Sequence, residues 1–249
     1  MDGSTPPSPH TEALDALWSS YRSKWRRLLS RNAVQELRLR ASFDVDLLAH
    51  WRMKNRTPAG TIPDCPNCNN ICCAGLENVV SLRLKDVACL IDIGRTDLMS
   101  KKKPNFPRSM LVERPGLREL VASELWRTLP VLRQTGDLKV CAALGPDLKC
   151  TLYPNWPLTC ERFPYTLNVM RKQVTWGTRC PSRQRDSSFE PRRKEMYKAA
   201  LNAYDERVKD AVLLAHARKE LDAAGIGEWL VKPDENPFEE TPRGLPIIQ

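Results

Sequence analysis

The spacing of apolar and polar residues predicts a long amphipathic helix near the start of the chain. Over residues 11–39, apolar side chains recur every three or four positions, the spacing at which residues share one face of a helix. The opposite face is basic and carries Arg22, Lys24, Arg26, Arg27 and Arg31. Two interpretations of this face stay open: an ordinary solvated surface, or a surface that binds nucleic acid, acidic lipid or a protein partner.

The same helical spacing recurs further along the chain. It predicts a second long helix over residues 196–212, with Gly225 and Gly227 as the expected terminators. Shorter helices are predicted over residues 43–51, 86–93 and 117–129. Residues 140–178 have a different pattern, in which brief apolar segments alternate with turn residues. This pattern predicts short strands and tight loops.

The cysteines add chemistry to this pattern, because eight of the nine fall into two groups. The first group is local and consists of Cys65, Cys68, Cys72 and Cys73. The second is spread over Cys141, Cys150, Cys160 and Cys180. Thiolates are soft ligands that select zinc or iron–sulfur chemistry over hard cations, and the C-x2-C spacing of the first pair is common in zinc sites. We therefore expect all eight to be metal ligands.

The adjacent pair Cys72 and Cys73 indicates how these sulfurs are divided. Neighbouring Cα atoms lie about 3.8 Å apart, and in an extended segment their side chains point to opposite faces. In a helix the two side chains would diverge by roughly 100°. Either geometry disfavours a mononuclear site that takes both, so we expect two four-sulfur sites or one cluster with spare thiolates. The ninth cysteine, Cys89, has no cysteine partner at ligand spacing and is expected to pack as a small hydrophobe.

A longer motif surrounds the second group. Residues 150–164 read CTLYPNWPLTCERFP, preceded by a run that ends in Cys72-Cys73 and followed by Cys180-Pro181. This order and spacing resemble the YkgJ-type cysteine-cluster family, whose members are described as zinc- or iron-chelating domains. The resemblance covers less than half of the chain and implies that the cysteines hold a metal. It does not imply a particular reaction.

Two positions depart from that family pattern. Trp156 stands where an arginine is usual, and Glu161 separates Cys160 from Arg162, so the role of the arginine is either lost or taken over by Arg162. Around the cysteines, prolines are expected to fix turns that orient the sulfurs, and aromatic residues to shield the centre from water. These residues are Tyr153, Pro154, Pro157, Phe163, Pro164 and Tyr165.

Together the patterns predict an α+β fold, mainly helical, with a small, irregular cysteine-rich metal-binding core that carries short strands. The expected layout is a flexible tail over residues 1–10, an N-terminal helical segment over 11–54, a YkgJ-like cysteine-cluster core over 55–185, a C-terminal helical segment over 186–231 that packs on the core, and an irregular tail over 232–249. The chain has no apolar run of the roughly 18 residues that would mark a membrane span.

Charge and composition indicate the ionisation state of these cysteines and the compartment in which the protein works. The formal net charge is +9, and cationic residues beside the sulfurs, such as Lys149, Arg162 and Arg179, favour the anionic thiolate form of the ligands. The first residues lack a basic stretch followed by an apolar one, so we expect no secretory signal, a cytoplasmic location and reduced thiols. A disulfide framework is the weaker alternative.

The sequence thus predicts a cytoplasmic metalloprotein that binds an iron–sulfur cluster, with zinc as the other option, through eight cysteine thiolates. The metal either builds the structure or supports redox chemistry, and no substrate follows from the residues. The alternative function is a zinc-scaffolded protein that engages nucleic acid or a protein partner through the basic helix. Only three histidines are present, none beside a cysteine or carboxylate motif, and no glycine-rich phosphate loop occurs, so no catalytic residues are predicted.

Overall fold

The computed structural model describes residues 8–31, 53–64, 72–74, 79–101, 129–168, 171–177, 180 and 183–231, with side chains up to residue 22 in the first of these segments. Several predicted features lie outside the described residues. They are the helix over residues 43–51, nearly all of the helix over 117–129, the tail over 232–249, and the pair Cys65 and Cys68.

Helices and small sheets occur together in the described chain, which confirms the predicted mixed α+β class. The α-helices are α1 (Pro9–Arg31), α3 (Leu84–Asp92), α6 (Leu158–Glu161), α7 (Glu190–His216) and α8 (Arg218–Ala223). Single turns of 3₁₀ helix are η2 (Thr96–Leu98), η3 (Ser187–Phe189) and η4 (Gly227–Trp229). None of these helices is long and apolar enough to cross a membrane.

The described strands are short and form several small sheets. They are β1 (Lys54–Asn55), β2 (Thr61–Pro63), β3 (Met99–Ser100), β4 (Val131–Leu132), β5 (Gln134–Thr135), β6 (Val140–Cys141), β7 (Tyr165–Asn168), β8 (Gln173–Trp176) and β9 (Arg183–Arg185). Strand β8 lies between β1 and β7, parallel to β1 and antiparallel to β7. The pairs β2–β9, β3–β4 and β5–β6 are antiparallel. The predicted strands and tight loops of residues 140–178 are confirmed by β6, β7 and β8.

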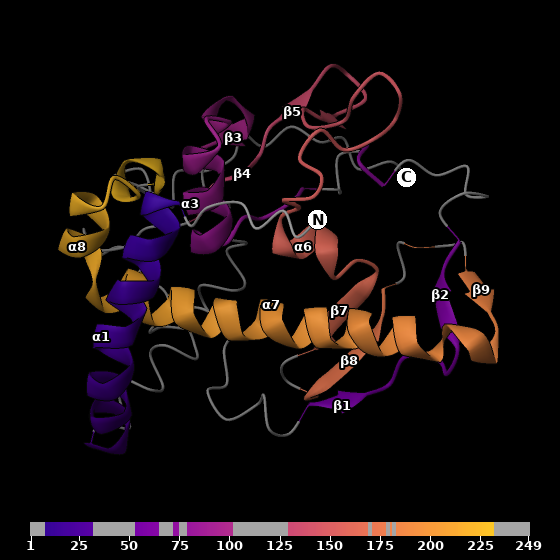
Figure 1. Cartoon of the computed structure of the whole chain (residues 1–249), viewed down its shortest axis with the longest axis horizontal. Helices are drawn as coiled ribbons and strands as arrows, with labels where there is room; N and C mark the ends of the chain where they lie inside the picture. The colour runs from indigo at the N-terminus through magenta and orange to yellow at the C-terminus, as the bar shows by residue number, and fades with distance from the viewer. Residues whose placement is uncertain are drawn as a thin grey trace, which may run out of the picture.

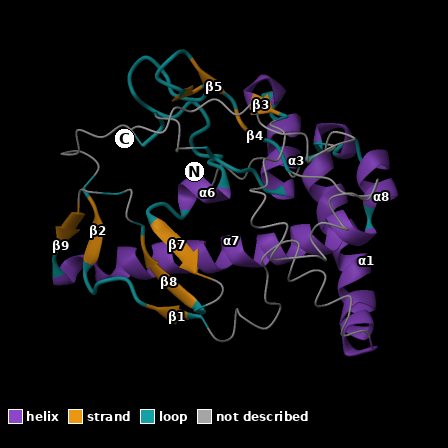
Figure 2. Ribbon diagram, turned by 180° about the vertical axis from the view of Figure 1, so that it is seen from behind, coloured by secondary structure: helices purple, strands orange, loops and turns teal. Residues whose placement is uncertain are grey.

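Helix α7 is the long central helix on which many other elements pack. It runs along the long axis, with α1 and α8 near one end and β2 and β9 near the other (Figure 1). It contacts α1, α3, α6, α8, β2 and β7, and the sheet of β1, β8 and β7 lies along its length (Figure 2). The predicted helix over residues 196–212 is therefore confirmed. The chain leaves the helix at Ala217, where φ is −118°, and Gly225 at φ +72° follows α8 instead of ending the long helix.

Helix α1 begins at Pro9, earlier than the sequence predicts, because a carboxylate from α3 holds its first turn. Oδ1 of Asp92 accepts a hydrogen bond from the backbone N–H of His10 at 3.1 Å. The same oxygen lies 2.6 Å from Nδ1 of the His10 ring. Oδ2 accepts from the backbone N–H of Thr11 at 3.2 Å. Helix starts leave such N–H groups without intrahelical partners, so this carboxylate acts as a cap supplied from another helix.

The apolar face of α1 packs on the core through Leu14, Leu17 and Trp18. Arg22 on the other face is exposed, and the side chains of the remaining basic residues of the helix lie outside the described part. The interpretation of this face as a nucleic-acid surface therefore stays a prediction.

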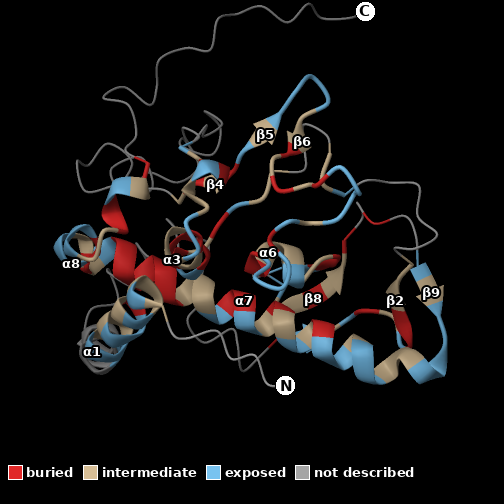
Figure 3. Cartoon of the chain, turned by 45° about the horizontal axis from the view of Figure 1, so that its top comes forward, coloured by how far each residue is buried: buried red, intermediate tan, exposed pale blue. Residues whose placement is uncertain are grey.

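The main hydrophobic core surrounds α3 and joins it to α1, α8 and the C-terminal part of α7. Figure 3 shows the buried residues concentrated there. Fully buried members include Leu82, Leu84, Val87, Leu213 and Leu221, and each such side chain stabilises the fold by about 1.5–3 kcal/mol relative to exposure. Cys141 belongs to this core, and Cys73 and Cys150 pack against it. The cysteine region is thus continuous with the core.

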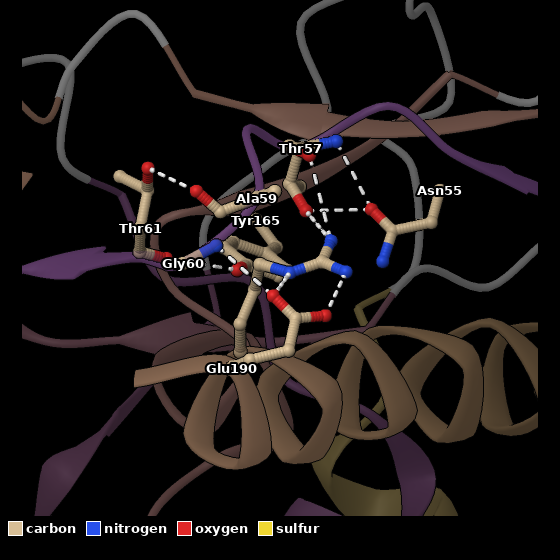
Figure 4. Close-up of polar contacts among 8 residues, drawn as sticks. Asn55, Thr57, Ala59, Gly60, Thr61, Tyr165 and Glu190 are labelled. Carbon is tan, nitrogen blue, oxygen red and sulfur yellow. Dashed lines mark hydrogen bonds and ion pairs between the residues drawn. The ribbon is translucent and has the colours of Figure 1, made fainter. Parts of the chain in front are cut away.

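A polar network holds the N-terminal end of α7 to the β1–β2 connection (Figure 4). The carboxylate of Glu190 accepts hydrogen bonds from Gly60 N–H at 3.0 Å and from Arg193 Nε at 2.7 Å. Nη1 of Arg193 donates to Thr57 Oγ1 at 2.9 Å, and that hydroxyl donates to Asn55 Oδ1 at 2.6 Å. These contacts tie the start of α7 to residues 55–60, so the network is a structural clamp.

Candidate functional site

Four cysteines from separate parts of the chain come together beside the core: Cys73, Cys141, Cys150 and Cys160, hereafter the thiol cluster. The backbone N–H of Cys141 donates to the carbonyl of Cys73 at 2.6 Å. Burial raises the pKa of the Cys160 thiol, and the charges of the other three cysteines raise it further. Because charges influence a pKa only at short range, these four sulfurs occupy one neighbourhood.

Cys141 and Cys150 are placed by two successive tight hairpins. Cys141 ends β6 and lies opposite Gln134 of β5. The chain then reverses, so that Leu144 bridges Cys150, and the N–H of Gly145 donates to the carbonyl of Lys149 at 2.7 Å. Two such reversals return the chain to the same edge of the core, and this brings two sulfurs nine positions apart in sequence close together.

Cys160 is placed by α6, a helix of only four residues. Figure 1 shows α6 beside α7, between α3 and β7. Pro157 precedes the helix with φ −56°, the value its ring dictates, which agrees with the expectation that prolines set the turns here. So short a helix has little stability of its own, because helix nucleation is unfavourable, and its position depends on contacts with its neighbours.

A single segment links α6 to the strand that leads to Cys141. Oγ1 of Thr159 donates to the carbonyl of Ser81 at 2.9 Å, and Ser81 also forms a β-bridge with Val131. The N–H of Leu82 donates to the carbonyl of Pro130 at 3.1 Å. Residues 80–82 therefore hold α6 on one side and the approach to β4 and β5 on the other.

The electrostatics of the thiol cluster disfavour thiolates in the absence of a cation. Burial raises the pKa of Cys73 to about 11, with further contributions from Cys141, Cys150 and Cys72. The pKa of Cys141 is raised by burial and by Cys150. Each negative sulfur thus opposes ionisation of the others, and a bound cation would reverse that preference.

Positive charge lies close to this group. Arg162, the residue after α6, is partly buried, and its pKa is lowered to about 10 by burial and by neighbouring Arg83 and Arg207, while Cys160 acts in the opposite direction. Its Nη1 atom donates to the carbonyl of Tyr165. A guanidinium is therefore held within electrostatic range of the Cys160 sulfur, as expected if Arg162 takes over the role of the missing arginine.

The other described cysteines have different surroundings. Cys72 is exposed and influences the pKa of its neighbour Cys73. Cys180 is buried just beyond the end of β8, where its N–H donates to the carbonyl of Gly177 at 3.2 Å and its carbonyl accepts from Nε1 of Trp176 at 3.1 Å. Cys89 lies half-buried on α3, and its thiol pKa is raised by burial and then by Asp86 and Asp92, which agrees with its assignment as a packing residue.

The donor chemistry of the thiol cluster fits a soft metal, since sulfur ligands suit zinc and iron–sulfur clusters. The spacing is looser than a coordination shell: among the described residues, no group of three His, Cys, Asp or Glu side chains lies close enough to hold one ion. No disulfide joins two of the described cysteines. The first two sulfurs of the motif, Cys65 and Cys68, fall outside the described part of the chain.

The expectation that the aromatic residues of the motif shield the centre is wrong for Tyr153. Tyr153 is 70% exposed and Trp156 40% exposed, and their rings contact each other with centroids 5.3 Å apart. Tyr165 is fully buried, but it packs on α7 with Val174 and Met196, away from the main core. Aliphatic residues of the main core, including Leu132 and Leu152, cover the cysteine region instead.

Sequence reasoning also missed a set of buried carboxylates beside α6. Asp86 accepts from the N–H of Arg83 at 2.8 Å and from the N–H of Leu158 at 3.0 Å. Asp210 accepts from the N–H of Leu84 at 3.2 Å and lies 3.5 Å from Nη1 of Arg83. The local signal for Asp86 was an acidic residue three positions after a helix start, whereas Asp210 lies inside a long helix and had no local signal.

Comparison with protein-family models, with curated proteins and with solved structures gives no match for this chain. The resemblance to the YkgJ-type family therefore rests on the motif residues alone.

Proposed function

We propose that this protein binds a metal centre through its cysteine thiolates, with an iron–sulfur cluster favoured over zinc. The observation that supports this proposal is the convergence of Cys73, Cys141, Cys150 and Cys160 beside the core, close enough for their charges to interact. Sulfurs that are distant in sequence come together here without a disulfide between any described pair. A shared ligand is the chemical reason that best accounts for such an arrangement.

The proposed ligand set is the full set of eight cysteines: Cys65, Cys68, Cys72, Cys73, Cys141, Cys150, Cys160 and Cys180. The thiol cluster would supply the ligands that come from distant segments, and Cys72 lies next to it in sequence. An all-thiolate set with adjacent members favours a cluster over a single zinc ion. When bound, a cluster supplies one-electron redox chemistry, whereas zinc held by four cysteines is redox-inactive and stabilises the structure.

The residues of the chain have a defined role in this proposal. Ligands must be thiolates, so binding releases the protons that burial and mutual repulsion hold on the cluster sulfurs. Arg162 offsets part of the negative charge that results at Cys160. The proposal extends to membership of the YkgJ-type family and to a cytoplasmic setting, where thiols not bound to metal stay reduced.

The test is anaerobic purification followed by a visible spectrum and by measurement of iron, acid-labile sulfide and zinc. We expect broad visible absorption from thiolate-to-iron charge transfer, with iron and sulfide in comparable amounts. A colourless protein with stoichiometric zinc would replace the iron–sulfur version by the zinc version. A protein that holds neither metal after reconstitution with each would contradict the proposal itself.

A further inference from the structure

One buried carboxylate joins the starts of two helices beside the thiol cluster. Oδ2 of Asp86 accepts from the N–H of Arg83, at the start of its own helix α3. Oδ1 accepts from the N–H of Leu158, the first residue of α6. Asp86 is only 6% exposed, so neither hydrogen bond is readily replaced by water. Each oxygen thus accepts from one N–H group at a helix start that has no partner within that helix.

Through α6, this carboxylate fixes the position of one cluster sulfur. Cys160 lies two residues after Leu158 in the same short helix. The charge of Asp86 is near enough to influence Cys160 directly. The hydroxyl of Thr159 adds a parallel tie from α6 to Ser81. Both ties end on the segment 81–86, so the orientation of α6 is set by that segment.

The same segment is tied to the part of the chain that carries Cys141. Residues 80–82 exchange backbone hydrogen bonds with residues 130–132: the N–H of Leu82 donates to Pro130, and the N–H of Leu132 donates to Val80 at 2.9 Å. The N–H of Ala142, next to Cys141, donates to the carbonyl of Arg133 at 2.8 Å. Segment 80–86 is therefore the common frame for two cluster sulfurs that come from different elements.

We propose that Asp86 is the positioning residue of the thiol cluster: its two hydrogen bonds hold α6 so that the Cys160 sulfur faces Cys73, Cys141 and Cys150. This inference rests on the proposed function, since positioning is defined here by the metal that the sulfurs bind. An asparagine at this position keeps the size of the side chain but offers a single acceptor oxygen, so only one of the two helix starts can be capped.

The chain offers a matched control at the other end of α3. Asp92 is also an α3 carboxylate that caps the start of another helix, and its side chain is only 2% exposed. The helix it caps is α1, through His10 and Thr11, and α1 carries no cysteine of the motif. Asp86→Asn and Asp92→Asn therefore each weaken the cap that α3 supplies to another helix, and only the first changes a contact of α6.

The experiment is an anaerobic titration of the reduced, metal-free full-length protein with Co²⁺. Binding is measured from the thiolate-to-cobalt absorption and from the visible ligand-field bands. We expect Asp86→Asn to weaken Co²⁺ binding by roughly 10- to 100-fold, the range for residues that orient metal ligands, and to alter the ligand-field bands. Asp92→Asn is expected to leave both unchanged. Equal Co²⁺ affinity and identical bands in the two variants would overturn the role of Asp86.

Two further measurements keep the inference testable. If circular dichroism shows that Asp86→Asn is unfolded, Thr159→Val removes the parallel tie to Ser81 instead, and unchanged Co²⁺ affinity in that variant would overturn the positioning role of this frame. If the wild-type protein binds no Co²⁺, the zinc version of the proposed function fails. In that case the rate of disulfide formation at Cys160 under a mild thiol oxidant decides the positioning role: a slower rate in Asp86→Asn than in Asp92→Asn supports it, and equal rates overturn it.

Discussion

Buried carboxylates organise the residues around the thiol cluster. Burial raises the pKa of Asp86 to about 6 and that of Asp210 to about 7, while hydrogen bonds from backbone N–H groups and the charge of Arg83 act in the opposite direction. A carboxylate that is costly to ionise in the folded protein links folding to pH. These two residues therefore make the stability of this region depend on protonation.

The sign of that dependence follows from the direction of the shift. With a pKa near 7 when folded and near 4 when unfolded, Asp210 binds its proton more tightly in the folded state. Its contribution to stability is complete below about pH 4 and is lost as the pH rises through 7. Each unit by which the pKa is raised corresponds to about 1.4 kcal/mol.

Asp210→Asn tests this effect, because the asparagine can still accept from Leu84 but carries no titrating group. In urea unfolding of the metal-free protein, the wild type should lose more free energy of unfolding between pH 4 and pH 7.5 than the variant does. The comparison between the two proteins cancels the titration of other groups. An identical pH dependence in both would contradict the assignment of a raised pKa to Asp210.

The cysteine residues of the site could be predicted from the sequence, but their support could not. The spacing of the sulfurs and the flanking motif pointed to all four members of the thiol cluster, because cysteines are rare and distinctive in a sequence. The sequence around Asp86 has no distinctive feature. Its role depends on a hydrogen bond from the N–H of Leu158, which is far away in sequence. Tyr153 misled in the other direction, since an aromatic side chain in a turn can lie at the surface, here against the exposed ring of Trp156, instead of covering the core.

At the level of elements, helix α7 connects the cysteine region to the rest of the fold. Its N-terminal end is clamped to the β1–β2 connection, where Gly60 adopts φ +61°. A Cβ atom at Gly60 would lie 2.5 Å from the carbonyl oxygen of Asp186, and the carbonyl of Gly60 itself accepts from the N–H of Asp186. Both the conformation and the space at this position therefore require glycine.

Gly60→Ala should destabilise the protein through both effects, and Gly94→Ala separates them. Gly94 has a similar φ of +67°, but a Cβ atom added there would meet no other atom within 4 Å. The alanine at Gly94 should cost about 1–2 kcal/mol for the left-handed backbone alone. The alanine at Gly60 should cost about 1–3 kcal/mol more, because the methyl group overpacks the site. Equal urea midpoints for the two variants would contradict the close approach of Asp186.

Helices were predictable where apolar periodicity was long, and strand pairing was not. The helices over residues 86–93 and 196–212 correspond to α3 and α7, because core contact imposes a repeating pattern on a helix face. Strands of two or three residues carry too few positions for alternation to show. Their pairings are also distant in sequence, as between β1 and β8 and between β2 and β9. Short local patterns contain no information on such partners.

For the whole molecule, the thiol cluster is where segments from different parts of the chain meet. Cys73 precedes α3, Cys141 and Cys150 lie in successive hairpins, and Cys160 lies in α6. The hydrogen bonds of the segment 80–86 and the packing of Cys141 in the main core hold these parts together. The fold thus assembles sulfurs that no local motif could bring into one place.

The most direct test of this account compares the metal content of Cys160→Ser and Cys89→Ser with that of the wild type after identical anaerobic purification. Both residues are partly buried cysteines on helices, but only Cys160 belongs to the thiol cluster. Cys160→Ser should lose most of the bound metal and the associated absorption, whereas Cys89→Ser should retain the wild-type metal-to-protein ratio. Retention of metal by Cys160→Ser, or its loss from Cys89→Ser, would contradict the claim that the thiol cluster is the metal centre.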